Sequence, residues 1–256
     1  LRTGRLLMES GADTPRIMRN MKRTAAYLGF LERDLQIYVN INLLMVNYAD
    51  GEQSFTKFKR CNRHVINMTV ISSVSKLSWR AIRENYTYEQ FGAALDEIET
   101  RKPNYTTWQV AVGGGFACGG FCIQFGCDWP AFVYASVAAI LGFRLRMYLN
   151  SRGSNNYVNI AFASFVSTML AWLLGVFNVL GSSTPWHALM ACALFIVPGV
   201  PLINFVSDML TGYTQVGITR AVNTLLMVLA MAFGIAFAID VSGLDNFVRD
   251  LTMTPH

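Results

Sequence analysis

A broken apolar segment carries the residues best suited to bind a solute. Between residues 186 and 206 an apolar run is interrupted by Val197-Pro198-Gly199-Val200-Pro201, just before Asn204 and Asp208. Proline lacks a backbone N–H and clashes with the preceding helical turn. A bilayer therefore tolerates such a break only where protein, water or a ligand satisfies the freed backbone groups. The pattern predicts a binding site within a membrane domain.

The predicted chemistry is recognition of a carboxylate. Pro201 suits the first position of a new helical segment, whose free backbone N–H groups attract an anion. Asn204 and Asp208 are one helical turn apart and share a face. We expect Asn204 to orient the solute and Asp208 to take an ammonium group or a proton. In the alternative interpretation Asp208 lies at the cytoplasmic membrane edge, pairs with Arg220 and binds nothing.

Two further ionisable residues stand close to apolar segments. Arg220 either neutralises a substrate carboxylate or anchors the last segment at the membrane interface, and anchoring is the favoured interpretation. Asp240 is interpreted as a solvated boundary residue rather than a proton relay. The predicted substrate-binding residues are Pro198, Gly199, Pro201, Asn204, Asp208 and Arg220.

Five apolar segments must position these residues. The chain is 53% hydrophobic and only 14% charged, which is too apolar for an ordinary soluble domain. Each segment is close to the roughly 20 residues that cross a hydrocarbon core. We therefore expect a transmembrane domain over residues 107–256, with spans at 107–125, 129–147, 157–180, 186–206 and 216–239.

The first of these spans contains five glycines, of which Gly115 and Gly119 are four residues apart. Glycines at this spacing let helix backbones approach closely, which favours tight packing of the span. A passage for substrate along the glycine groove is the alternative.

The first 106 residues contain most of the charge and are expected to form an α+β domain. Thr14 is a plausible N-cap with Pro15 at the first helical position, so two helices are expected on either side of residues 11–15. Residues 35–49 alternate as a strand does, and Asp50-Gly51 supplies a turn before a second strand. The further expected elements are the strand 54–60 and helices at 67–83 and 88–101.

Positive charges indicate the orientation. The connections 126–128 and 181–185 carry no base, whereas basic residues flank the opposite ends of the spans at Arg101, Lys102, Arg144, Arg146, Arg152 and Arg220. Lys and Arg are enriched in cytoplasmic loops. The N-terminal domain is therefore predicted to be cytoplasmic, and an odd number of spans places the tail 241–256, with its single base Arg249, outside.

The sequence argues against several other classes. The net charge of +5 is not gathered into the aromatic-interleaved basic patch of a nucleic-acid binder. Five cysteines show no pairable framework and are interpreted as packing residues; no histidine lies near them to complete a metal site. No nucleophile, base and acid stand at a recognisable spacing, so we expect no enzyme, no cofactor and no metal.

Several of these motifs together resemble the threonine/serine exporter (ThrE) family and, within it, the YjjP-type subunit. The opening Gly4-Arg5-Leu6-Leu7-Met8-Glu9-Ser10-Gly11-Ala12-Asp13-Thr14 is similar to the N-terminal signature of the family, and Asn67-Met68 to a segment after its strands. The most specific match is Val197-Pro198-Gly199-Val200-Pro201-Leu202-Ile203-Asn204, continuing through Asp208, Gly212, Gly217 and Arg220. The resemblance covers essentially the whole chain.

This resemblance implies an exporter of small metabolites in the bacterial inner membrane. The chain ends after the fifth predicted span, as the split form does, which implies a YjjB-type partner subunit and an oligomer. The implied substrates are threonine and serine or, for the split pair, small dicarboxylates such as succinate. We expect outward transport driven by the proton gradient; a structural subunit whose partner forms the path is the alternative. Because the chain opens at Leu1, an upstream start of the reading frame is also compatible with the sequence.

Overall fold

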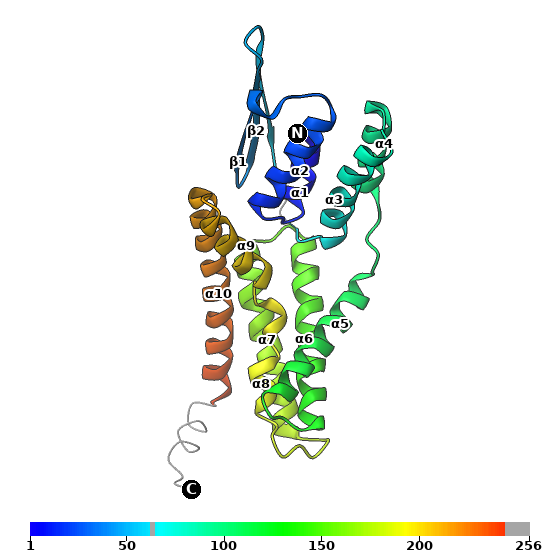
Figure 1. The fold of residues 1–256 in the computed structure, drawn as a ribbon. Coiled ribbons are helices and arrows are strands. Elements are labelled where there is room, and N and C mark those ends of the chain that lie inside the picture. Colours follow the sequence, from blue (N-terminus) through cyan, green and yellow to red (C-terminus); the bar gives the residue numbers. More distant parts are fainter. Residues whose placement is uncertain (62–64, 244–256) are drawn as a thin grey trace. The chain divides into compact units, whose positions relative to one another are not determined.

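A computed structural model describes residues 1–61 and 65–243 and is shown in Figure 1. The chain folds into two compact units. Unit 1 comprises Leu1–Lys102 and Gly199–Thr224, and unit 2 comprises Pro103–Pro198 and the residues from Leu225 on. The domain boundary after residue 106 stays a prediction. Most of the expected outer tail, including Arg249, lies outside the described residues.

Unit 1 begins with the two expected helices, α1 (Arg2–Glu9) and α2 (Thr14–Tyr27). Gly11 lies between them with a φ of +79°, a conformation that favours glycine. The N-cap of α2 is Asp13 rather than Thr14, and its side chain makes no capping hydrogen bond. The first backbone N–H groups of α2 are therefore open to partners from elsewhere in the fold.

The sheet of unit 1 has three antiparallel strands in the order β1 (Leu35–Asn40), β2 (Leu43–Ala49) and β3 (Ser54–Arg60). The prediction of one continuous strand over residues 35–49 was wrong. The side-chain oxygen of Asn40 accepts a hydrogen bond of 2.7 Å from the N–H of Ile41, and the chain turns there. Asparagine favours turns because its short side chain bonds nearby backbone in this way. The turn at Asp50-Gly51 and the strand after it are as expected.

A short 3-10 turn, η1 (Glu32–Asp34), precedes the sheet. Helices α3 (Met68–Arg83) and α4 (Tyr88–Thr100) follow the sheet, as predicted, and complete the N-terminal part of unit 1. Asn67 caps α3, and Thr87 with Gln90 forms a capping box on α4. The core of this unit draws buried side chains from both helix pairs and the sheet, among them Leu7, Ile17, Leu44, Val74 and Leu95.

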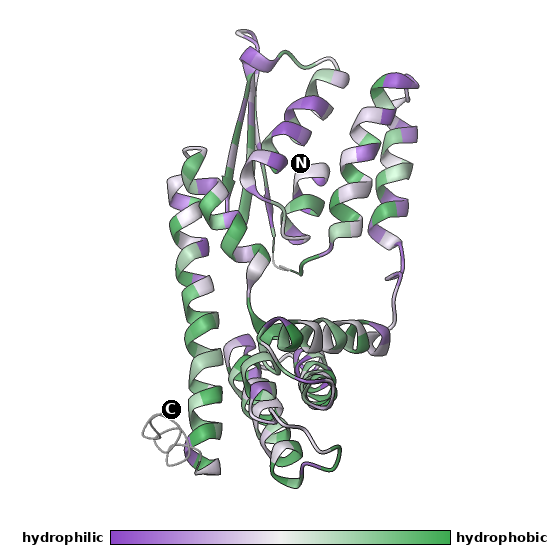
Figure 2. Cartoon of the chain, turned by 60° about the horizontal axis from the view of Figure 1, so that its bottom comes forward, coloured by the Kyte–Doolittle hydropathy of each residue, from purple (hydrophilic) through white to green (hydrophobic). Residues whose placement is uncertain are grey.

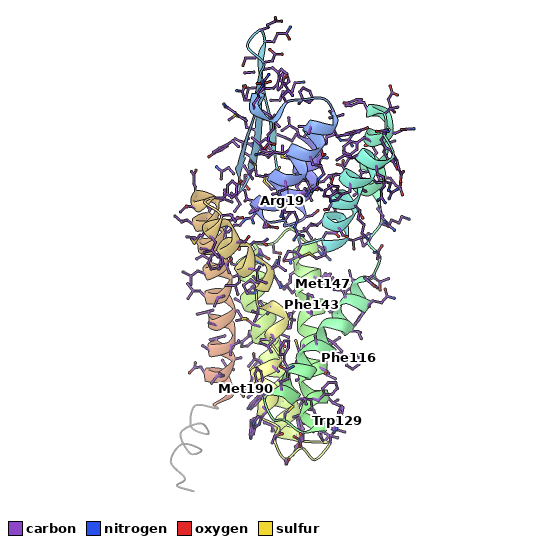
Figure 3. The ribbon with its side chains drawn as sticks, viewed as in Figure 1. Arg19, Phe116, Trp129, Phe143, Met147 and Met190 are labelled. Atoms are coloured by element: carbon purple, nitrogen blue, oxygen red, sulfur yellow. The ribbon has the colours of Figure 1, made fainter. Side chains whose placement is uncertain are left out.

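Unit 2 consists of α5 (Thr107–Gln124), α6 (Trp129–Ser151), α7 (Asn156–Phe177), the short α8 (His187–Ala191), η2 (Leu194–Ile196) and the later part of α10 (Thr214–Ser242). Its outer side chains are large and apolar; Figure 3 labels Phe116, Trp129 and Met190, which are exposed by 55%, 73% and 59%. Such a surface is suited to lipid or to another subunit rather than to water.

Small residues bring the helices of unit 2 together. A Cβ on Gly119 would lie 2.1 Å from Oγ of Ser136 in α6, and a Cβ on Gly115 would lie 2.8 Å from the carbonyl oxygen of that residue. The interpretation of these glycines as packing residues is confirmed. Close packing at a glycine also joins α10 to α7, where a Cβ on Gly234 would lie 2.2 Å from the carbonyl oxygen of Ala161.

Asp128 organises the connection before α6 and was not singled out from the sequence. Its carboxylate accepts hydrogen bonds from Ala131 N–H at 3.0 Å, from Ser182 Oγ at 2.7 Å and from Ser183 N–H at 2.7 Å. Partial burial raises the pKa of Asp128, but these hydrogen bonds outweigh burial and hold it well below its usual value. One ionised carboxylate thus caps α6 and ties it to the connection after α7.

Three helices of the described chain, α6, α7 and α10, are long and apolar enough to cross a membrane. They become four if the helical segments on either side of Val197-Pro198 count as one broken span. The prediction of five is not confirmed, because the glycines and polar end residues of α5 dilute its apolar content. Figure 2 shows hydrophobic residues along most of α10.

Candidate functional site

Helix α9 (Gly199–Leu210) carries most of the predicted site residues. Its burial pattern is the reverse of that in a soluble protein, because apolar side chains are exposed and a charged one is buried. Its apolar side chains Ile203 and Leu210 are 71% and 83% exposed, whereas Asp208 is fully buried. An apolar outer face with a polar inner face is what a helix presents when lipid or a second subunit covers it. The helix begins at Gly199, two residues before the expected start at Pro201.

The carboxylate of Asp208 binds the start of α2. The backbone N–H of Thr14 donates to Oδ1 at 2.9 Å, and the hydroxyl of Thr14 donates to Oδ2 at 3.1 Å. Arg220, from the first turns of α10, places Nη1 3.1 Å from Oδ2. The positive end of a helix, a hydroxyl and a guanidinium therefore converge on one buried carboxylate.

Two further hydrogen bonds hold the backbone just before Thr14. Asn204 Nδ2 donates to the carbonyl oxygen of Gly11 at 2.8 Å, and Arg220 Nη2 donates to that of Ala12 at 2.9 Å. Side chains from α9 and α10 thus satisfy polar groups along residues 11–14, about 190 residues earlier in the chain. We call these contacts of Asn204, Asp208 and Arg220 with residues 11–14 the latch.

The latch is almost inaccessible to solvent, and one of its N–H groups, on Arg220, has no hydrogen-bond acceptor among the described residues. The side chain of Arg220 is 12% exposed and that of Asp208 is 0% exposed. Nη1 of Arg220 forms the ion pair without hydrogen-bonding geometry, and it has no hydrogen-bond partner within the described residues. A buried guanidinium with an open N–H is a site at which another acceptor gains binding energy.

The structure therefore brings together three of the six predicted residues, Asn204, Asp208 and Arg220. Gly199 and Pro201 form the first turn of α9 outside the latch, and Pro198 belongs to unit 2. The pairing of Asp208 with Arg220, which the sequence left open as an alternative, is observed. The assignment of all six residues to substrate binding stays a prediction.

Sequence reasoning missed the role of residues 11–14. A carboxylate does bind a helix start, but the helix is α2 rather than the segment after Pro201, and the carboxylate belongs to Asp208. The signal available was that the opening motif through Thr14 and the motif from Val197 to Arg220 both match one family. Nothing in their spacing indicates that they meet.

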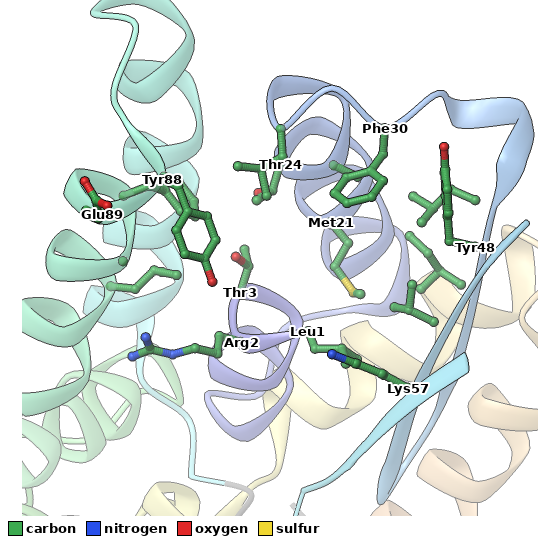
Figure 4. A pocket seen from close by; sticks show the side chains of 18 of the residues that line it. Leu1, Arg2, Thr3, Met21, Thr24, Phe30, Tyr48, Lys57, Tyr88 and Glu89 are labelled. Atoms are coloured by element: carbon green, nitrogen blue, oxygen red, sulfur yellow. The ribbon is translucent and has the colours of Figure 1, made fainter. Parts of the chain in front are cut away.

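A large apolar groove lies elsewhere in unit 1, away from the latch. A groove of about 810 Å³ runs between α1, α2, the sheet and α4, and Figure 4 shows its apolar lining around Met21, Phe30 and Tyr48. None of the six predicted site residues lines it. Arg2 at its rim is already paired with Asp96. The groove therefore offers an apolar surface rather than a second carboxylate site.

Comparison with known proteins gives a consistent result. The family described as "Putative threonine/serine exporter" matches residues 1–242. The chain is 27% identical to "Probable succinate transporter subunit YjjP" of Escherichia coli (strain K12), covering 97% of this chain and 95% of that protein. It is 26% identical to the protein of the same name from Klebsiella aerogenes, covering 94% and 92%.

A more distant relative is longer than this chain. The chain is 20% identical to "Probable threonine/serine exporter" of Mycobacterium tuberculosis over 93% of its own length but only 45% of that protein. No solved structure matches.

Proposed function

The chain belongs to the threonine/serine exporter family, and from this premise we propose that it is an exporter subunit of the bacterial inner membrane. It moves small carboxylate-bearing metabolites outward together with a YjjB-type partner subunit, and its N-terminal part faces the cytoplasm. The names of the two relatives matched over nearly their whole length favour a C4-dicarboxylate such as succinate. The family description favours threonine and serine as the second candidate.

The observation that carries the proposal is the carboxylate of Asp208 between Thr14 and Arg220. These two residues form a receptor for one carboxylate, and in this structure a side chain of the protein fills it. A substrate carboxylate has the same geometry and charge, so it competes with Asp208 for the same donors. Exchange of the two carboxylates opens the latch when a solute arrives.

Proton coupling follows from the charge balance of the latch. When Asp208 takes a proton it becomes neutral, and the positive charge of Arg220 is left without its partner. A substrate carboxylate then restores neutrality at Arg220. On this scheme one proton on Asp208 leaves the cell with one substrate carboxylate, and loss of both closes the latch again. The outward gradient of the solute then drives export, in place of the inward proton gradient expected from the sequence.

The test is efflux from cells that express the protein with its partner subunit. Asp208→Asn mimics the protonated state permanently, so export of labelled succinate should fall to background while the protein remains in the membrane. Asp240→Asn makes the same chemical change at an exposed position on α10 and should retain efflux. Wild-type efflux from the Asp208 variant would falsify the role of the latch.

The rival function is a structural subunit whose partner contains the whole path. It predicts that simultaneous alanine substitution of Asn204, Asp208 and Arg220 leaves export intact whenever the complex assembles. Co-purification of the partner subunit with the triple variant, measured beside efflux, separates the two functions. Loss of efflux with normal assembly supports the proposal.

A further inference from the structure

A second polar site lies on unit 1, away from the latch. Helices α2 and α3 line an open pocket of about 630 Å³, to which α2 contributes Arg16, Arg19 and Arg23, and α3 contributes Lys76 and two serines. We propose that this basic pocket binds a compact anion with at least two negative charges, either a phosphate group or a small dicarboxylate. The site is distinct from the transport site and goes beyond the proposed function.

The basic pocket has positive charge that the described chain does not neutralise. Arg16 pairs with Asp13 at 3.2 Å. Within residues 1–61 and 65–243, no carboxylate lies within ion-pair distance of Arg19, Arg23 or Lys76. Burial and then the neighbouring charge of Arg19 lower the pKa of Arg23, as expected where cations are gathered. An external anion relieves this repulsion.

Arg23 is held in place by contacts that leave its charge intact. Its Nη1 donates to Oγ of Ser78 at 2.9 Å, and that hydroxyl donates to Oδ1 of Asn20 at 3.0 Å. Asn20 and Ser78 are 3% and 2% exposed, so this network is buried between α2 and α3. The guanidinium also stacks on Trp79, 3.8 Å from the ring centroid.

Such a fixed guanidinium loses little conformational freedom when it binds an anion. The serines of α3, Ser72 and Ser75, add hydroxyl donors to the same pocket. Guanidinium and hydroxyl groups together are the donor set that proteins use for phosphate and carboxylate oxygens. Figure 3 labels Arg19 on α2; Arg19 and Arg16 are exposed, whereas Arg23 is partly buried.

The basic pocket shares helix α2 with the latch. Arg16 lines the pocket and pairs with Asp13, and the next residue, Thr14, binds Asp208. An anion in the basic pocket competes with Asp13 for Arg16. Binding there therefore acts on the turn that holds the latch, which makes the pocket suited to regulating it.

The test measures binding of inorganic phosphate to the full chain in neutral-lipid nanodiscs by calorimetry at constant ionic strength. Phosphate is the probe because succinate is also a proposed solute of the latch. Arg19→Gln removes one pocket cation without touching the Ser78 network. It should weaken anion binding roughly tenfold, which is the worth of one charge-assisted hydrogen bond. Arg33→Gln makes the same charge change at a residue that does not line the pocket and should leave the affinity unchanged.

A second arm identifies the source of the anion by repeating the titration in nanodiscs that contain phosphatidylglycerol. Loss of phosphate binding there shows that a lipid headgroup fills the basic pocket, and unchanged binding shows a free anion. The proposal is overturned if phosphate does not bind in neutral nanodiscs, or if Arg33→Gln weakens binding as much as Arg19→Gln.

Discussion

The buried ion pair of the latch predicts strong coupling between two substitutions. Arg220→Gln leaves the carboxylate of Asp208, which is 0% exposed, without its counter-charge. Removing one partner of a buried ion pair lowers the free energy of unfolding by about 3 to 5 kcal/mol. The two hydrogen bonds from Thr14 remain and offset part of that cost, so we expect about 3 kcal/mol.

The matching change on the other side should rescue this loss. Asp208→Asn keeps the shape of the side chain and removes its charge, so the double variant no longer buries an unpaired carboxylate. We expect it to recover at least 1 kcal/mol relative to the sum of the single losses, within the roughly 0.5 to 3 kcal/mol seen for coupled neighbours.

The assay is the unfolding midpoint of the four proteins in one detergent, followed by tryptophan fluorescence. For a chain of this size about 3 kcal/mol corresponds to a shift of roughly 6 to 12 °C. Asp240→Asn combined with Arg220→Gln is the control cycle, and its two effects should add. If the losses at residues 208 and 220 also add, the latch does not hold the two charges together and the reasoning fails.

Three further outcomes follow from the packing and the caps. Gly119→Val should lower the unfolding midpoint by several degrees because its side chain meets Ser136. Gly120→Val on the same helix should not, because a Cβ on Gly120 has no atom within 4 Å. Asp128→Asn keeps a capping oxygen on α6 but removes the charge of the carboxylate, and it should cost about 1 kcal/mol at neutral pH because charge-assisted hydrogen bonds are stronger than neutral ones. Because the folded-state pKa of Asp128 is depressed, its ionic contribution is present above the unfolded pKa of about 4 and lost below it. The difference in unfolding midpoint between wild type and this variant should therefore shrink as the pH falls below about 4, and a constant difference would argue against an ionised cap. Thr14→Val keeps the backbone N–H but removes the hydroxyl donor to Asp208, and it should slow efflux less than Asp208→Asn does; equal losses would show that the hydroxyl is as important as the charge.

Local patterns in the sequence were sufficient for most helices and for the packing glycines. The start of α3 after Asn67 and the start of α4 after Thr87 follow from capping residues at the expected positions. The turn after Asn40 was missed because asparagine is also tolerated within a strand. The apolar content of α5 was overestimated because its glycines extend an apolar run without adding hydropathy.

The candidate site required more than local patterns. Proline placement and the spacing of Asn204 and Asp208 indicated that one helix face carries polar groups in an apolar segment. Those same patterns suggested that a solute would satisfy them. In the structure, side chains of Asn204, Asp208 and Arg220 satisfy residues 11–14 instead.

The sequence by itself determined the membrane class, most elements and the choice of Asp208 and Arg220 as residues of interest, because these depend on composition and on periodicities shorter than about two turns. Only the tertiary structure decided what those residues contact. The start of α2 and the end of α9 are separated by about 190 residues, and their meeting depends on how the whole of unit 1 packs. Local spacing in the sequence cannot predict a contact between residues so far apart, because a buried carboxylate binds whichever donor the tertiary fold places beside it.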